Sequence, residues 1–490
     1  MKRYILLLIA AFSLRAQAQT ISIHVLGGQD SVIQVQYPIN GINYNWWPNK
    51  KNYQLDAHHY TSFRNALGGA GMIHLIYGGK IYNIVTEPGK SLAFKLIVTG
   101  KEQTLEAQGA NAAGIVLLNQ LNRQFYQYKA RDYLKKDSVM LNVKSAIEQD
   151  MKKELIRFDS LLAIKKISPV FYRYARRDIR YHYAAVLSFV ICGEYARRRY
   201  DIKHPAYKAT LNKDMEAAWP GVYTAYALND TFAAGAPDFF DYAKDYISWY
   251  KEMYLSEKGG TGKAPLDKHN QFERYYKGFT DNFAGSTREY LQARYIFEEA
   301  SQQEFQPELI TLFNNFTRSY PSSKYTVFLT PLIADIKSYQ AAQEQPLKPG
   351  QQLLESSKIT SFDQLMAPFK GKIVYVDLWA TWCAPCKEQF RYNAELKKFL
   401  TDNNVEMLYI SMDKDDADVQ WKEMIRYYDL KGSHVRTTDS LRKELLVKLW
   451  DGKSYWIPRY LIVKDGVIVQ ANAFQPSDKQ KLYDQIKKGT

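Results

Sequence analysis

Two cysteines that directly follow an apolar run constrain the fold of this chain most. The run extends from Ile373 to Trp379, and Trp382-Cys383-Ala384-Pro385-Cys386 then opens a stretch with helical spacing. We predict a strand over 373–379 and a helix that begins at the cysteines. Unpaired N–H groups and the macrodipole at a helix start stabilise an anion, so Cys383 is predicted to form a thiolate, with Cys386 facing inward as the resolving thiol. The pattern indicates a dithiol redox centre.

Two other interpretations of the cysteine pair stay open, a structural disulfide and half of a zinc site. A zinc site with four thiolates needs a second pair, and the chain has one further cysteine, Cys192, within an apolar segment. Cys192 is predicted to be a small buried apolar residue. No metal site and no cofactor are predicted.

Four acidic residues gather between Asp413 and Asp418. We interpret them as a solvated loop followed by the start of a helix. Calcium binding stays open as an alternative, because calcium prefers carboxylate oxygens.

The first eighteen residues have the pattern of a secretory signal. Lys2 and Arg3 precede an apolar run from Ile5 to Phe12, and Ala16-Gln17-Ala18 provides small residues for cleavage after Ala18. The run is well short of the roughly 20 apolar residues that span a bilayer, so no stable membrane insertion is expected. We therefore predict export to the periplasm as a soluble protein. The three cysteines argue against a disulfide-stapled scaffold.

The chain is basic, with a formal net charge of +15, and most of the excess lies ahead of residue 351. Export excludes nucleic acid as an ordinary partner. Anionic lipid, a glycan or an acidic protein stays open as a partner, but we interpret the excess charge as a solvated surface.

Composition shifts predict a multidomain chain. Residues 19–108 alternate apolar and polar side chains between turn signals such as Asn40-Gly41 and Gly78-Gly79, which predicts a small all-β, sandwich-like domain. Residues 109–345 are predicted to form an all-α region, and Pro346 to Gly350 a linker into a last domain at 351–490. Amphipathic runs are expected at 113–135, 139–165, 169–200 and 288–302.

The stretch from Val376 to Lys387 resembles the active-site segment of thioredoxins, especially the TlpA/ResA-like periplasmic thiol-disulfide oxidoreductases. A second match runs from Tyr455 to Val469 and contains Ile457-Pro458, a proline that is cis in this family and faces the cysteines. The resemblance covers about residues 350 to 490 and implies an α/β thioredoxin-like domain with a redox-active disulfide between Cys383 and Cys386.

Asp377, six residues before Cys383, matches the buried acid of thioredoxins. Burial raises the pKa of a carboxyl group, which suits Asp377 to accept the proton of Cys386. The alternative is an aspartate at the end of a strand that is exposed to water.

The resemblance also implies a groove for the substrate beside the cis proline. We expect the groove to be lined by Trp382, Ala384, Pro385, Trp456, Ile457 and Pro458. Trp379 and Tyr455 would complete its apolar rim, with a place in the core as the alternative for Trp379. One departure from the family is Arg391, which stands where thioredoxins have a helix-kinking proline, so a straighter helix is expected.

The pattern as a whole favours an exported enzyme that reduces protein disulfides, with electrons supplied by a membrane protein. A dithiol oxidase or isomerase is the alternative within the same chemistry. In a different class of function, the front two thirds would bind a glycan, an envelope component or a client protein, and the thioredoxin-like domain would be accessory.

Overall fold

The computed structural model describes residues 19–37, 39, 50–67, 69–121, 124–231, 233–259, 271–343 and 345–489. The predicted signal segment 1–18 and the predicted turn at Asn40-Gly41 lie outside these residues. The chain divides into two compact units, residues 1–294 and 295–490, and the division falls within α9 (Gly285–Ser301).

The first unit begins with two four-stranded sheets, as the alternating pattern predicts. One sheet has the order β4-β1-β7-β8 and the other the order β3-β2-β5-β6. The first consists of β1 (Thr20–Leu26), β4 (Tyr60–Arg64), β7 (Leu92–Thr99) and β8 (Glu102–Gly109), and the second of β2 (Val32–Gln36), β3 (Lys50–Gln54), β5 (Gly71–Tyr77) and β6 (Lys80–Thr86). Gly78 and Gly79 join β5 to β6 with positive φ angles of 54° and 76°, which glycine adopts without steric cost.

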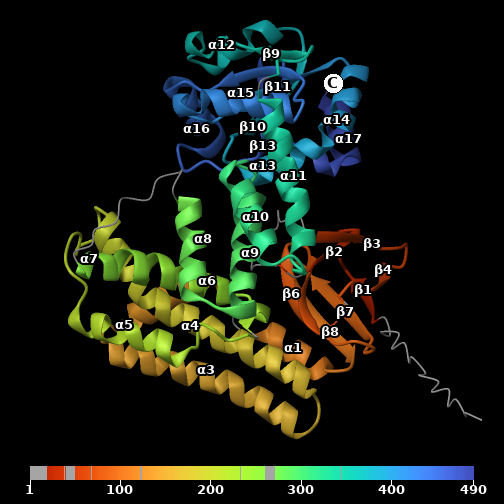
Figure 1. Ribbon diagram of the computed structural model, residues 1–490. Helices are drawn as coiled ribbons and strands as arrows, with labels where there is room; N and C mark the ends of the chain where they lie inside the picture. The colour runs from red at the N-terminus through yellow and green to blue at the C-terminus, as the bar shows by residue number, and fades with distance from the viewer. Residues whose placement is uncertain are drawn as a thin grey trace, which may run out of the picture. The chain divides into compact units, whose positions relative to one another are not determined.

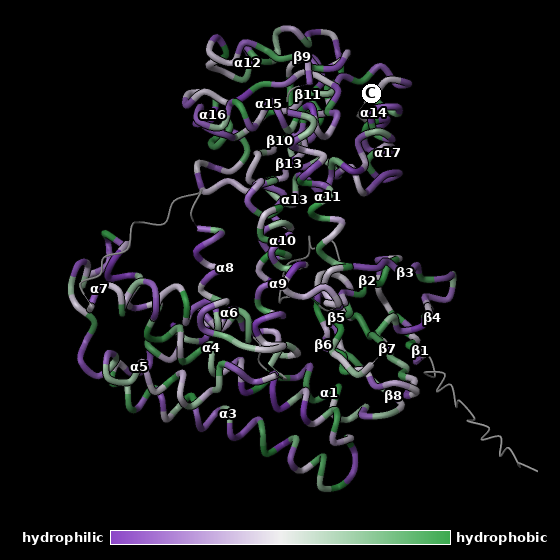
Figure 2. Tube along the Cα trace, in the orientation of Figure 1, coloured by the Kyte–Doolittle hydropathy of each residue, from purple (hydrophilic) through white to green (hydrophobic). Residues whose placement is uncertain are grey.

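Helices follow the sheets in the first unit, which confirms the predicted central helical region. They include α1 (Ala112–Gln120), α2 (Tyr126–Lys136), α3 (Met140–Ala163), α4 (Pro169–Tyr200), α5 (Lys213–Ala225), α6 (Phe239–Asp245), α7 (Ser256–Lys258) and α8 (Gln271–Asn282), with a π-helical stretch at Tyr246–Leu255. Apolar and polar residues alternate along α3 (Figure 2), as an amphipathic helix requires. Cys192 is fully buried in α4.

One helical prediction is wrong in detail. The amphipathic run at 113–135 is split into α1 and α2, because the backbone becomes extended at Leu121. Periodicity on its own does not reveal this break, since apolar spacing continues on both sides of it.

The second unit contains α10 (Glu308–Ser319) and α11 (Thr326–Ala342), followed by a six-stranded sheet with the order β14-β13-β10-β11-β12-β9. The strands are β9 (Gln351–Leu353), β10 (Ile373–Trp379), β11 (Val405–Ser411), β12 (Gly432–Arg436), β13 (Arg459–Lys464) and β14 (Val467–Gln470). β10 pairs in parallel with β11 and antiparallel with β13, so the sheet is mixed.

Helices cover both faces of this sheet, which gives the predicted α/β domain of thioredoxin-like fold (Figure 1). One face carries α14 (Asn393–Asp402) and α17 (Gln480–Gly489), and the other carries α15 (Asp418–Tyr427) and α16 (Asp439–Trp450). Two short helices, α12 (Phe362–Met366) and α13 (Ala384–Gln389), complete the domain. β13 and β14 form a hairpin around Asp465 and Gly466, as the sequence predicts.

The expectation of a straighter helix after the cysteines is wrong. α13 ends at Gln389, a 3₁₀ turn covers Phe390–Tyr392, and α14 begins at Asn393. Phe390, the first residue of this 3₁₀ turn, is buried, and its ring lies 5.2 Å from that of Trp379. Within the described ranges, no helix is long and apolar enough to cross a membrane.

Candidate active site

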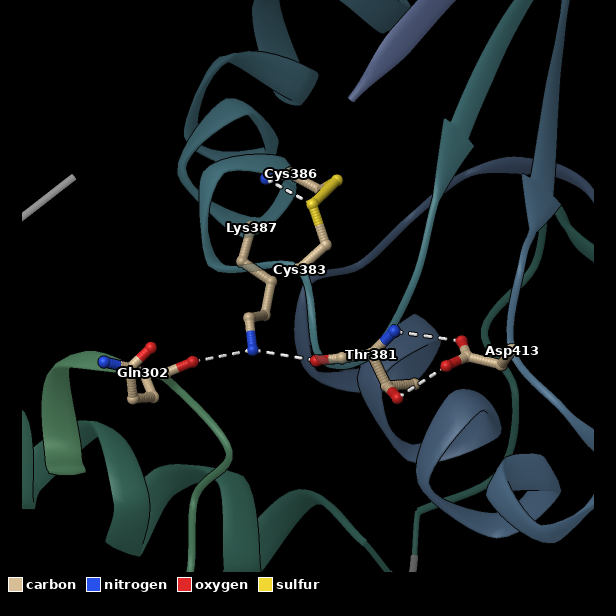
Figure 3. Close-up of a disulfide and its surroundings, with 6 residues drawn as sticks. All are labelled: Gln302, Thr381, Cys383, Cys386, Lys387 and Asp413. Carbon is tan, nitrogen blue, oxygen red and sulfur yellow. Dashed lines mark hydrogen bonds between the residues drawn. A yellow bond between two sulfur atoms is a disulfide. The ribbon is translucent and has the colours of Figure 1, made fainter. Parts of the chain in front are cut away.

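The two cysteines lie where β10 gives way to α13 and are joined by a disulfide, with a Cα–Cα distance of 5.3 Å. Cys383 is the N-cap of α13, and its Sγ accepts a hydrogen bond from the backbone N–H of Cys386 at 3.2 Å (Figure 3). Pro385 fits the first turn, where a backbone N–H is not needed. Both cysteines are buried, and Cys383 at 3% exposure is slightly more accessible than Cys386 at 0%.

Asp377 is completely buried in β10. The sheet register places it between Tyr409 of β11 and Tyr460 of β13. Neither carboxyl oxygen has a hydrogen-bond partner in the part of the chain that the structure describes. Burial raises the pKa of Asp377 well above its usual range, because nothing in its surroundings compensates the charged form.

The predicted groove residues lie at one end of the sheet. Arg459 pairs with Leu378, so the residues just before Arg459 and just after Leu378 share that end. The peptide bond between Ile457 and Pro458 is cis, as the resemblance implies. Ile457 and Pro458 are half-buried, whereas Ala384 is buried.

The aromatic residues expected at the rim separate into two groups. Trp382 is 52% exposed and Trp456 is 60% exposed, which leaves both rings open to a ligand. The Trp456 ring contacts the Trp450 ring at a centroid distance of 5.9 Å, and the guanidinium of Arg459 lies 5.2 Å from the Trp456 ring centroid. Trp379 is completely buried, so its place is the core and not the rim.

Lys387 is a site residue that sequence reasoning missed. It follows Cys386 directly, yet its side chain is fully buried. Its Nζ donates to the backbone carbonyls of Gln302 and Thr381, both at 2.8 Å (Figure 3), and to that of Gln303 at 3.0 Å. Burial lowers the pKa of Lys387 to about 7, although the carboxylates of Glu304 and Asp413 oppose this shift.

Asp413 corrects the interpretation of the acidic stretch as solvated. Only its later members reach solvent, whereas Asp413 is 2% exposed and lies two residues after the end of β11. Its carboxylate accepts from the N–H of Thr381 at 2.9 Å, from the Thr381 hydroxyl at 2.9 Å and from the Ser411 hydroxyl at 2.7 Å. Its position after a buried parallel strand is the signal that could have identified it.

These hydrogen bonds fix Thr381, in the turn before the cysteines. Its amide and hydroxyl donate to the Asp413 carboxylate, and its carbonyl accepts from Lys387 Nζ. In the part of the chain that the structure describes, no group of three or more histidine, cysteine, aspartate or glutamate side chains could hold a metal ion.

Comparison with known proteins gives the same assignment. A family model described as Redoxin matches residues 349–486. Thiol-disulfide oxidoreductase ResA from Bacillus thuringiensis subsp. konkukian is 31% identical over 141 residues, which cover 28% of this chain and 72% of the relative. ResA from Bacillus anthracis is 36% identical over 78 residues, 16% of this chain and 41% of the relative.

Among solved structures, the match to a candidate thiol-disulfide oxidoreductase from Bacteroides vulgatus, determined in solution, has 31% sequence identity and a TM-score of 0.21. This match covers 25% of this chain and 78% of that chain. The match to ResA extends over most of the relative's own length, and the Redoxin match covers the domain that carries the two cysteines. Through its C-terminal domain, the chain belongs to the ResA-like thiol-disulfide oxidoreductases of the thioredoxin family.

Proposed function

We propose that this protein is exported to the periplasm and reduces disulfides in protein substrates through Cys383 and Cys386. The observation that carries the proposal is the asymmetry of the pair. Cys383 caps a helix and receives the backbone N–H of Cys386, whereas the Cys386 side chain is sealed in the core. A backbone donor stabilises a thiolate at Cys383, and burial keeps Cys386 in reserve for the second step.

In the first step the Cys383 thiolate attacks one sulfur of the substrate disulfide. A bond forms between Cys383 and that sulfur, the substrate S–S bond breaks, and the other substrate sulfur leaves as a thiolate. Asp377 then accepts the proton of Cys386, and its raised pKa brings it closer to that of a thiol. The Cys386 thiolate attacks Cys383 Sγ, which forms the Cys383–Cys386 disulfide and releases the second substrate thiolate.

Two electrons pass from the dithiol to the substrate in this cycle, so a dithiol donor must reduce the Cys383–Cys386 disulfide before the next cycle. We propose a membrane protein for this role, because the signal pattern at 1–18 directs the chain out of the cytoplasm. The substrate is an extended protein segment beside its disulfide. Trp382 and Trp456 provide exposed apolar area for it, and we expect Ala384, Pro385, Ile457 and Pro458 to line the same groove.

Insulin reduction by the full-length protein tests the proposal. We expect Cys383→Ser to abolish activity, Cys192→Ser to retain it, and Asp377→Asn to slow release of the mixed disulfide by roughly 10²-fold while leaving the first attack intact. Stopped-flow kinetics separate the two steps. Equal alkylation of both thiols at neutral pH, or a slower first step alone in Asp377→Asn, would contradict the assigned roles.

The direction of electron flow needs its own measurement. A midpoint potential near the value of about −270 mV for thioredoxin supports a reductase, whereas a value near the −120 mV or so of DsbA would favour the oxidase alternative. Equilibration with glutathione buffers, followed by alkylation of the free thiols, gives this potential.

A further inference from the structure

The segment 302–305 follows α9 and packs against the thioredoxin-like domain within the second unit. Besides the bonds from Lys387, the Tyr428 hydroxyl donates to the Gln303 side chain at 2.9 Å, and the Gln340 side chain donates to the Phe305 carbonyl at 2.8 Å. Gln303 and Phe305 both have a positive φ of 55°, which is unfavourable for residues with a side chain. Such a conformation persists only where the surroundings impose it.

Aromatic rings continue this packing toward the cysteines. Phe305 stacks on Tyr339 of α11 at 4.4 Å and contacts Tyr427 of α15 at 4.9 Å. The neighbouring Tyr428 contacts Phe390 at 5.0 Å. Since Phe390 packs on Trp379 at the end of β10, contacts run from segment 302–305 to the strand that leads into the dithiol.

Lys387 joins the same two parts through hydrogen bonds. An ammonium group has three N–H donors, and three backbone carbonyls surround it, so all three donors find an acceptor. Two of the acceptors belong to Gln302 and Gln303, which lie outside the region that matches the Redoxin family. The third belongs to Thr381, two residues before Cys383.

We propose that Lys387 is a positioning residue that ties segment 302–305 to the turn carrying Cys383, so that the redox equilibrium of the dithiol depends on this upstream segment. The proposal rests on the proposed dithiol chemistry and extends it to residues upstream of the region that matches the Redoxin family. Because coupling between two sites is reciprocal, the redox state of the dithiol then also changes the stability of segment 302–305.

Lys387→Met tests the tie, because methionine has a similar length, no charge and no donor. Below its pKa of about 7 the Lys387 side chain carries a positive charge, and removing this charge makes the Cys383 thiolate less stable relative to the disulfide. We expect the equilibrium constant for reduction by glutathione to fall at least threefold and Cys383 to alkylate at least threefold more slowly. Lys398→Met, at an exposed lysine of α14, is the matched control and should leave both unchanged.

Hydrogen exchange on the full chain reports on the segment itself. The amides of Gln302 and Gln303 donate to the carbonyls of Glu299 and Ala300, so they exchange only when this stretch opens. We expect at least threefold faster exchange of both amides in Lys387→Met than in wild type. We also expect the exchange rates of oxidised and reduced wild-type protein to differ.

Tyr428→Phe gives a second test that keeps Lys387 and the packing of the rings. It removes only the hydroxyl bond to Gln303 and should shift the glutathione equilibrium in the same direction by a smaller factor. A folded Lys387→Met protein with wild-type equilibrium and exchange would overturn the tie, as would a shifted equilibrium without faster exchange at 302 and 303. If the wild-type dithiol fails to equilibrate with glutathione, the proposed function fails instead.

Discussion

The carboxyl group of Asp377 is completely buried and has no contact with solvent. Tyr409 and Tyr460 flank it across the sheet, and burial together with the Asp377 carboxyl raises the pKa of both phenols well above the usual range. Compared with water, such surroundings favour the neutral, protonated form of a carboxylic acid over its charged form. The folded protein therefore binds a proton at Asp377 in a pH range where the unfolded chain has lost it.

This difference predicts how stability depends on pH. The carboxyl of an unfolded aspartate loses its proton near pH 4, whereas the raised pKa moves proton loss from Asp377 to a higher pH in the folded state, so its contribution to stability falls as pH rises above about 4. Asp377→Asn removes this loss and should be more stable than wild type at pH 7 by roughly 1–3 kcal/mol. Urea unfolding with the disulfide intact should show a smaller difference at pH 4 than at pH 7.

Asp402→Asn provides the control at an exposed carboxylate on α14. It should change stability by no more than about 0.5 kcal/mol at either pH. If wild type instead gains stability over Asp377→Asn between pH 4 and pH 7, the carboxyl is charged in the folded protein.

At the scale of elements, the turn between β10 and α13 matters most. The strand provides Asp377, the helix start provides Cys383 and Cys386, and Thr381 lies between them. Asp413, from the end of the neighbouring strand β11, satisfies the amide and the hydroxyl of Thr381. The C-terminal ends of the parallel strands β10 and β11 thus position the turn that carries the cysteines.

Thr381→Val tests this arrangement, because it keeps the size of the side chain and the backbone N–H but removes the hydroxyl bond to Asp413. We expect a loss of roughly 1.5–3 kcal/mol in the free energy of unfolding, since a buried carboxylate oxygen loses its donor. Thr401→Val, at an exposed position on α14, should stay within about 0.5 kcal/mol of wild type by chemical denaturation. Equal losses in the two variants would show that the Asp413 contact contributes little.

At the scale of the whole molecule, the second unit begins well upstream of the predicted linker. α10 and α11 lie in this unit, and the Tyr339 hydroxyl of α11 donates to Glu423 of α15 at 2.8 Å. A fragment that starts at the linker would leave Lys387 with one carbonyl acceptor instead of three. It would also expose Tyr427, which packs against Phe305 and Tyr339.

Residues 295–490 should therefore form a more stable fragment than residues 346–490. We expect a difference in Tm of roughly 5–10 °C, which corresponds to a few kcal/mol for domains of this size. Thermal unfolding of both fragments, with the disulfide formed, measures it. Identical Tm values would show that the upstream helices add nothing to the redox domain.

The sequence by itself determined the features that depend on near neighbours along the chain. The strand before the cysteines, the helix that starts at Cys383, the hairpin at Asp465-Gly466 and the long helices α3 and α4 follow from local periodicity and turn chemistry. Only the tertiary structure decided that Lys387 and Asp413 are buried and that Phe390 interrupts the helix. The physical reason is distance along the chain, because the carbonyl of Gln302 that binds Lys387 lies 85 residues upstream, beyond any local pattern.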